Sequence, residues 1–302
     1  MKKNIIPAIL FFAVLTVSVK LSAANRPADE QDKVIDKVQY RIIYQTKSVS
    51  DTASRDSTGA YQYDTDEMRL DIGTKISRFY SYTNEHYDSL LDKYAERGDV
   101  QVLPDSEAGS LQWVVYKNFP DGKTQVLDNV FIDEFKIIEP TQQPEWQMVE
   151  GACQPKWEVI ADSVVTILGY KCQMAHARFK GREWWAWFAE DIPLDNGPWK
   201  LCGLPGLILR AFDSEQQYMF EAVGLQQLKG TADIVYKAKY EKYEPISMKQ
   251  FVELRSKVTP MDAFSAKGIK ISVDASAADV DKNELMQHLN GRTPYNPIEI
   301  VE

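Results

Sequence analysis

Four of the seven tryptophans of this chain lie between residues 184 and 199, and they are the side chains best suited to binding. They are Trp184, Trp185, Trp187 and Trp199, with Arg182 just before them. Aromatic rings supply apolar contact area, and a nearby arginine adds cation–π and carboxylate-binding capacity. On an extended strand, Trp185 and Trp187 share one face and Trp184 points to the other. We expect Arg182, Trp185, Trp187 and Trp199 to bind a sugar, lipid or peptide. The alternative is that the rings fill the core of a large sheet.

Acidic residues beside the tryptophans suggest a second hypothesis, a hydrolase of glycans. A pair of carboxylates flanking a sugar is the machinery of most glycosidases. The nearby acids are Glu183, Glu190, Asp191, Asp195 and Asp213. The alternative is that they are solvated acids at turns and strand edges. No Gly-x-Ser-x-Gly, His-Glu-x-x-His or phosphate-binding glycine loop occurs, and the only histidines are His86, His176 and His288. The sequence therefore favours a protein that is not an enzyme.

Cys172, Met174 and His176 alternate along a predicted strand and would project from one face. Sulfur with imidazole suits copper(I) or zinc, but ordinary alternation of core and surface residues explains the pattern equally, and we predict no metal and no cofactor. The three cysteines leave one thiol over after any single pairing. Spacing does not decide the pairing. We predict a disulfide between Cys153 and Cys172, with Cys202 buried and free.

The stretch from Asn196 to Leu209 contains three glycines and two prolines and runs directly into Leu207-Ile208-Leu209. Pro205-Gly206 suits the two central positions of a type II turn, in which the glycine takes a positive φ. Three consecutive apolar residues after a turn predict a strand buried on both faces. We therefore predict a structural turn that depends on the glycines and prolines Gly197, Pro198, Gly203, Pro205 and Gly206.

The letters from Gly203 to Ile208 read GLPGLI, and the chain resembles the GLPGLI family of envelope proteins from the Bacteroidetes. The resemblance extends to Gly169-Tyr170-Lys171-Cys172, Ala175, Phe179-Lys180-Gly181-Arg182, Trp187-Phe188, Ile192-Pro193, Gly197-Pro198-Trp199, Asp213 and the ending Tyr295-Asn296-Pro297-Ile298-Glu299. It implies an envelope location and covers the whole mature chain. It implies no reaction and no catalytic residues, because the family has no established activity.

The N-terminus predicts export. A basic start at Lys2-Lys3 precedes an apolar run from Ile5 to Val19 and the small residues before Ala24, which is typical of a secretory signal at 1–24. The alternative, a membrane anchor, needs a run of about 20 apolar residues. We expect one domain over 25–302, in the periplasm or at the outer membrane and not spanning it. The net charge of −9 argues against nucleic acid as a partner and leaves an envelope protein, a glycan or an apolar ligand. A structural partner of an outer-membrane receptor is a third hypothesis.

The exported chain also carries four tripeptides that look like the O-glycosylation pattern of this phylum. They are Asp51-Thr52-Ala53, Asp56-Ser57-Thr58, Asp88-Ser89-Leu90 and Asp162-Ser163-Val164. Each is short enough to occur by chance, and glycan-specific staining would test them.

The elements that must position these residues are mostly strands. Alternating and apolar runs predict strands at 38–44, 68–72, 76–82, 111–119, 124–135, 157–168, 170–179, 183–189, 207–211 and 218–228. Helices are expected at 84–97, 247–260 and 277–289. Short turns such as 120–123 join antiparallel neighbours, and so wide a sheet must curl. We predict a mainly β (α+β) fold: a curved antiparallel sheet or half-barrel with two or three helices, and a binding site on its concave face.

Overall fold

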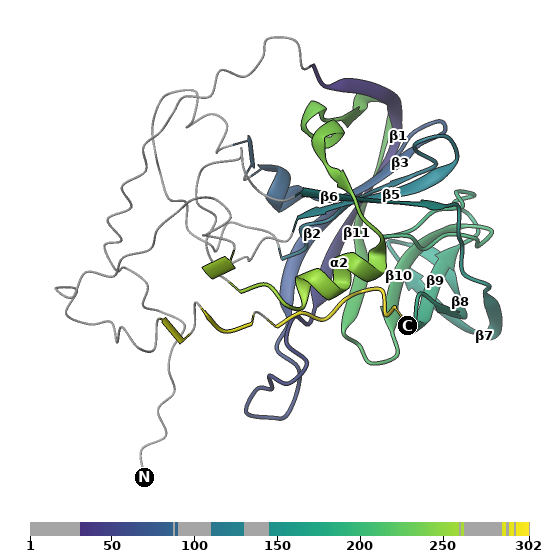
Figure 1. Cartoon of the computed structure of the whole chain (residues 1–302). Helices are drawn as coiled ribbons and strands as arrows, with labels where there is room; N and C mark the ends of the chain where they lie inside the picture. Colours follow the sequence, from purple (N-terminus) through teal and green to yellow (C-terminus); the bar gives the residue numbers. More distant parts are fainter. Residues whose placement is uncertain are drawn as a thin grey trace.

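The structure, a computed structural model, describes residues 31–86, 88–89, 110–129, 145–259, 261–262, 286–287, 290–292 and 294–301. Most of these residues belong to one large sheet (Figure 1). Its strands are β1 (Lys33–Ser48), β2 (Asp64–Ile72), β3 (Ser77–Ser81), β4 (Val114–Lys117), β5 (Lys123–Asn129), β6 (Glu145–Gly151), β7 (Glu158–Ile167), β8 (Tyr170–Phe179), β9 (Arg182–Ala189), β10 (Leu207–Asp213), β11 (Tyr218–Tyr236) and β12 (Glu244–Pro245). The predicted mainly β class is confirmed.

The twelve strands are ordered β12-β6-β5-β4-β3-β2-β1-β11-β10-β9-β8-β7. Each neighbouring pair is antiparallel, as the short turns predict, except that the two-residue β12 lies parallel to β6. Among the described strands, β7 therefore forms one edge of the sheet and β12 forms the other. The predicted hairpin at 120–123 is confirmed, since Phe119 N donates to Lys123 O at 2.8 Å.

The long strands β1 and β11 form the middle of the sheet. They pair antiparallel from Lys33↔Tyr236 to Ser48↔Tyr218, with register shifts at Val34/Asp36, Val38/Tyr40 and Ile43/Tyr44. Such irregularities bend a strand and increase its twist. Both strands extend beyond the predicted ranges, because their outer halves carry many polar residues and lack a clear alternation.

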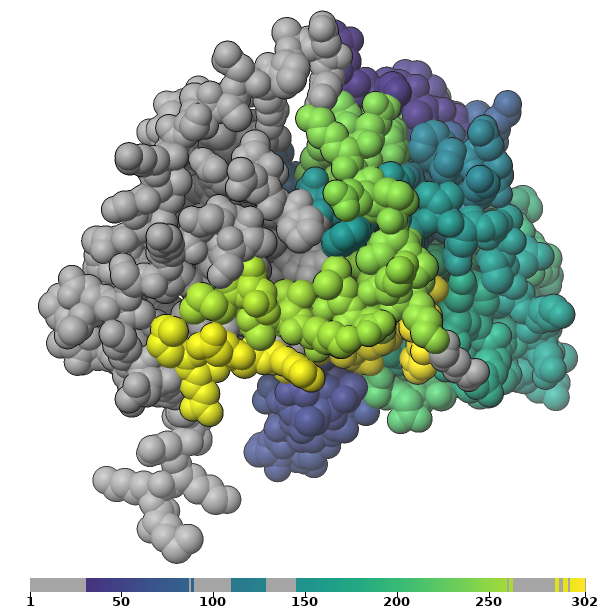
Figure 2. All heavy atoms as spheres, in the orientation of Figure 1, coloured from purple at the N-terminus to yellow at the C-terminus, as the bar shows by residue number. Residues whose placement is uncertain are grey.

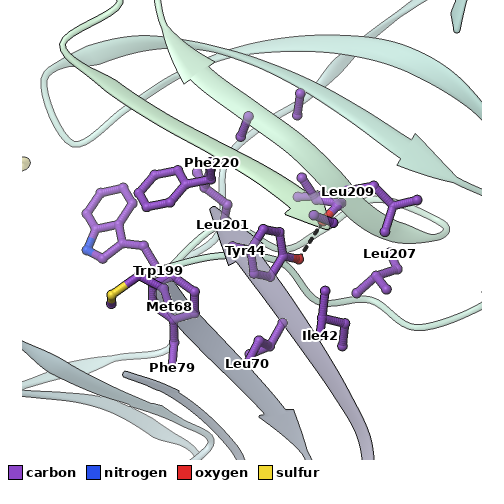
Figure 3. Close-up of a cluster of buried hydrophobic side chains, with 14 of the residues drawn as sticks. Ile42, Tyr44, Met68, Leu70, Phe79, Trp199, Leu201, Leu207, Leu209 and Phe220 are labelled. Carbon is purple, nitrogen blue, oxygen red and sulfur yellow. Dashed lines mark hydrogen bonds between the residues drawn. The ribbon is translucent and has the colours of Figure 1, made fainter. Parts of the chain in front are cut away.

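The main core lies against one side of this sheet (Figure 3). Three alanines stand side by side on neighbouring strands there, Ala175 on β8, Ala186 on β9 and Ala211 on β10. Their small side chains are fully buried and leave room for large rings. Trp184 and Trp199 are 5.5 Å apart between ring centroids, and Trp184 also stacks on Phe220. Leu207, Ile208 and Leu209 are all completely buried, which confirms a strand with no solvated side.

The helices are few and short in the described part of the chain. Ser247 caps α2 (Met248–Arg255) through a capping box with Gln250, and Phe251 of this helix packs into the core. The predicted cap is confirmed, although the helix ends before residue 260. Residues 82–86 and 88–89 are helical as expected, and a 3₁₀ turn, η2 (Ala238–Lys242), precedes β12. The remainder of the helix expected at 84–97 and most of the one at 277–289 lie outside the described residues.

No helix in the described ranges has the length and hydrophobicity that crossing a bilayer requires.

Candidate functional site

Alternation along β9 places Trp185 and Trp187 on the side of the strand away from Trp184 and Ala186, although Trp187 also packs against the main core cluster. Cross-strand pairing surrounds both rings with apolar and aromatic neighbours. Trp187 is opposite Met174 of β8 and Arg210 of β10. Trp185 is opposite His176 of β8 and Phe212 of β10. All six side chains are half-buried. We call this group the outer aromatic face, and its members are Met174, His176, Trp185, Trp187, Arg210 and Phe212.

Contacts within the outer aromatic face hold its rings in place. The His176 ring lies 4.6 Å from that of Trp185 between centroids, and His176 Nε2 is 2.8 Å from Glu183 Oε2. The Trp187 ring lies 5.4 Å from that of Phe212. The Arg210 guanidinium lies 5.7 Å from the Trp187 ring centroid. Close aromatic and cation–π pairs of this kind fix side-chain positions without covering them completely.

The sheet behind these rings is rigidly packed. Burial alternates along β9, so that Trp184, Ala186 and Phe188 are completely buried while Trp185 and Trp187 are half-exposed. A partner would therefore meet side chains that are already ordered, which lowers the entropic cost of binding.

The surroundings of the outer aromatic face are polar and balanced in charge. On β7, Glu158 lies opposite His176. On β11, Glu221 lies opposite Arg210 and forms an ion pair with it. Arg178 lies 3.9 Å from Glu183. Neither sign dominates, so the surface does not select for a strongly charged ligand.

Arg182 does not belong to this surface, which corrects the expectation that it binds a ligand. Its side chain is 4% exposed and all five of its N–H groups are in use. Nη1 donates to Asp213 Oδ2 at 2.7 Å and to Gln217 Oε1 at 3.0 Å. The other donors reach the C-terminal segment, at Asn296 Oδ1 (2.8 Å), Pro297 O (2.6 Å) and Ile298 O (3.1 Å). Arg182 therefore clamps residues 296–298 against β9.

Trp199 is also unavailable to a ligand, because it is 1% exposed and packs against Trp184 and Phe179. Of the four predicted binding residues, Trp185 and Trp187 are the two that remain partly accessible. The sequence reasoning missed Arg210 and Phe212. Phe212 lies one residue beyond the predicted strand, and a register shift between Ile208 and Arg210 decides which side chains join Trp187.

The predicted turn at Pro205-Gly206 is wrong in its mechanism. Gly206 does not have a positive φ, whereas Gly203 does, at 93°. Gly206 is required for a different reason: a Cβ there would stand 2.1 Å from Ala189 O. A Cβ on Gly197 would stand 2.8 Å from Ile208 Cβ. The glycines thus allow the loop between β9 and β10 to press against its own strands.

A buried amine anchors the same loop. Lys117 Nζ, at the end of β4, donates to Gly197 O at 2.7 Å and to Leu201 O at 3.4 Å. Burial lowers the pKa of Lys117 to about 8, and the negative charges of Cys202 and Asp195 offset only part of the lost hydration.

Lys200, in this loop, joins a second buried cluster. Its Nζ donates to Glu150 Oε1 at 2.6 Å and to Glu299, and Lys180 Nζ lies 3.5 Å from Glu299 Oε2. Burial opposes ionisation of Glu150, but the ammonium groups of Lys200 and Lys180 outweigh it and hold the pKa of this carboxyl below its usual value. The cluster is saturated with internal partners, which makes it a structural tie between the loop, β6 and the C-terminal segment.

Several acids named for a hydrolase have protein partners. Asp213 accepts from Arg182 and from Tyr218 N, Glu183 lies against His176, and Asp195 accepts from Gly203 N. Glu190 and Asp191 are exposed in a turn. No cluster of three or more His, Cys, Asp or Glu residues suited to a metal occurs among the described residues.

The predicted disulfide is not formed. Cys153, Cys172 and Cys202 are all free thiols. Cys153 is exposed whereas Cys172 is completely buried, which separates the two residues that were expected to pair. Cys202, expected to be buried, is half-buried.

Comparisons with known proteins give a family without a known function. A family model described as "Protein of unknown function (Porph_ging)" matches residues 171–210, which include β8, β9 and the GLPGLI letters. No curated protein matches the chain. Two solved structures of PNGF-II are similar at 11% identity, with TM-scores of 0.44 and 0.43. They cover 73% and 72% of this chain, which spans 34% and 32% of theirs.

Proposed function

We propose that this chain is an exported, non-enzymatic binding protein of the cell envelope, and that it holds a protein partner on the outer aromatic face. One observation carries the proposal: Trp185 and Trp187 stay partly exposed on the side of β9 away from Trp184, Ala186 and Phe188, which are completely buried. A core alone explains Trp184 and Trp199. It does not by itself explain why Trp185 and Trp187 stay partly exposed beside Phe212 and Met174.

The composition of this surface favours a protein over a small molecule. Protein interfaces are enriched in Trp, Phe, Met and Arg, and their strongest contacts centre on Trp, Tyr and Arg. Five of the six residues of the outer aromatic face are of these types. Pockets for small molecules are usually concave, whereas these residues lie side by side on three neighbouring strands of a sheet.

The location rests on the sequence. Residues 1–24 are typical of a secretory signal. The chain also resembles the envelope proteins of the GLPGLI family, and its motif lies inside the segment that matches the family model. The partner we expect is therefore an envelope protein of the periplasm or outer membrane, of which an outer-membrane receptor is one case. The hydrolase hypothesis gains no support, because Asp213 and Glu183 are held by Arg182 and His176.

Cross-linking in native envelopes followed by binding with purified components tests the proposal. A photoreactive residue in place of Phe212 should cross-link a protein, and that protein should then be purified. We expect Trp187→Ala and Trp185→Ala to weaken its affinity by about 10-fold or more, as loss of an interface anchor does. Tyr82→Ala is the matched control, because Tyr82 is a surface aromatic, 37% exposed, outside the outer aromatic face.

Two results would overturn the proposal. Equal affinity of the purified partner for wild type and both tryptophan variants would remove the outer aromatic face from binding. Binding of an envelope glycan that depends on Trp185 and Trp187, with no protein cross-linked, would replace the protein partner by a carbohydrate.

A further inference from the structure

Two segments that are distant in sequence run side by side and bring two cysteines together. Residues 150–157 comprise the last two residues of β6 and the segment that follows it, and residues 200–203 belong to the loop between β9 and β10. Glu150 Oε1 is 2.6 Å from Lys200 Nζ. Further along, a Cβ placed on Gly203 would stand 3.4 Å from the side chain of Gln154. Trp157 Nε1 donates to Cys202 O at 2.7 Å.

These contacts bracket Cys153 and Cys202. Cys153 lies between Glu150 and Gln154, and Cys202 lies between Lys200 and Gly203, so the contacts on either side place the two cysteines opposite each other. The electrostatics agree with this placement. Burial raises the pKa of the Cys202 thiol, the Lys117 ammonium opposes this, and the charges of Asp195 and Cys153 raise the pKa further. Such an influence requires that the sulfurs share one neighbourhood.

Access separates this pair from the third cysteine. Cys153 is exposed and Cys202 is half-buried, whereas Cys172 is completely buried within the main core. A soluble oxidant can therefore reach the thiol of Cys153 but not the thiol of Cys172.

We propose that Cys153 and Cys202 form a disulfide when the chain meets an oxidising compartment, and that Cys172 is the thiol left over. The bond would tie the segment after β6 to the loop that carries the GLPGLI letters, alongside the Lys200–Glu150 pair. The inference does not depend on the proposed function.

The chemistry is thiol–disulfide exchange with a low-molecular-weight disulfide such as oxidised glutathione. The thiolate of Cys153 attacks one sulfur of glutathione disulfide, which forms a mixed disulfide and releases one glutathione thiolate. The thiolate of Cys202 then attacks Sγ of Cys153 and releases the second glutathione. Two protein thiols are oxidised to one disulfide, the oxidant is reduced to two thiols, and the protons lost by the cysteines pass to the released thiolates.

Peptide mapping of the full chain tests the assignment without any substitution. The reduced protein should be oxidised with glutathione disulfide at pH 8, quenched with acid, alkylated in denaturant and digested without reductant. We expect free thiols to fall from three to one per chain, and a linked peptide that joins Cys153 to Cys202. Cys172→Ser should form the same link, whereas Cys153→Ser and Cys202→Ser should form no internal link. In Cys202→Ser the exposed Cys153 should remain as a mixed disulfide with glutathione.

Three outcomes would overturn it. They are three remaining thiols after oxidation, a link that includes Cys172, or a link between two copies of Cys153 in place of the internal bond. Circular dichroism of the oxidised wild type checks that the mapped protein is folded. A link that forms only in unfolded chains would not support the proposal.

Discussion

Trp184 and Trp185 are neighbours in the chain but occupy opposite sides of the sheet. Trp184 is completely buried against Trp199 and Phe220, while Trp185 is half-exposed beside His176. The same contrast separates Arg182, whose donors are all in use inside the protein, from Arg178, whose side chain is 71% exposed. One strand thus supplies the core with one side and the proposed binding surface with the other. Stability and binding should therefore respond to different residues of the same strand.

The largest loss of stability should come from Arg182→Ala. The substitution leaves the Asp213 carboxylate buried without its partner and removes three bonds to residues 296–298. Breaking one half of a buried ion pair costs about 3–5 kcal/mol. Denaturant unfolding should show this loss. Arg178→Ala is the control and should cost less than about 1 kcal/mol, because exposed pairs contribute little. Similar losses for the two variants would contradict the inner and outer assignment.

Trp199→Ala should be nearly as damaging. The ring is enclosed by Trp184 and Phe179, and its removal leaves a cavity that the rigid sheet cannot fill. Truncation of a buried tryptophan costs about 3–5 kcal/mol. The free energy of unfolding from urea titration measures it, and near-ultraviolet circular dichroism should also change. A loss below about 1 kcal/mol would mean that Trp199 is less tightly enclosed than its burial indicates.

Lys117→Met tests the burial of the Lys117 amine through the pH dependence of the free energy of unfolding. The folded pKa of Lys117, about 8, lies below the unfolded value, so the unfolded chain binds more protons between these values and wild-type stability rises with pH there. From pH 7.5 to 9.5 the gain should be about 2 kcal/mol. Lys117→Met lacks this gain, so the difference between the two unfolding free energies should change with pH by that amount. A difference that is constant over this range would show that Lys117 stays charged and hydrated.

The smallest effect on stability should come from Trp185→Ala on the outer side. The substitution removes the packing contacts of a partly exposed ring and leaves no enclosed cavity. Changes of this kind at a surface reduce the free energy of unfolding by about 1 kcal/mol. Thermal and urea unfolding of Trp185→Ala and Trp199→Ala under identical conditions would compare the two sides directly. Equal losses would indicate that the outer aromatic face is a second core and not a place for a partner.

The sequence predicted elements better than it predicted accessibility. Alternation located most of the strands and placed Trp185 and Trp187 on one face, and the residue type of Ser247 located the helix cap. It could not show which face would be buried, because both sides of β9 carry aromatic residues. The polar stretch of β6 was missed, although it pairs with β5 along its length.

Contacts between residues that are distant in sequence could not be predicted either. The sequence around Arg182 suggests a ligand-binding arginine, but residues 296–298, more than 100 positions later, accept its hydrogen bonds. Gly206 was read through local turn chemistry, but its role depends on Ala189 O, a carbonyl seventeen positions earlier. The prediction paired Cys153 with Cys172, whereas the fold brings residues 150–157 beside residues 200–203.

The unequal edges of the sheet limit how copies of this protein can join. β7 offers ten residues with no neighbouring strand among those described, broken by the irregularity between Ile160 and Val164. β12 offers only two residues and is followed by the capped helix α2. An endless cross-β stack requires every molecule to accept a neighbour at both ends. Because β7 presents the longer row of backbone groups, edge-to-edge contact between copies would form most readily through β7.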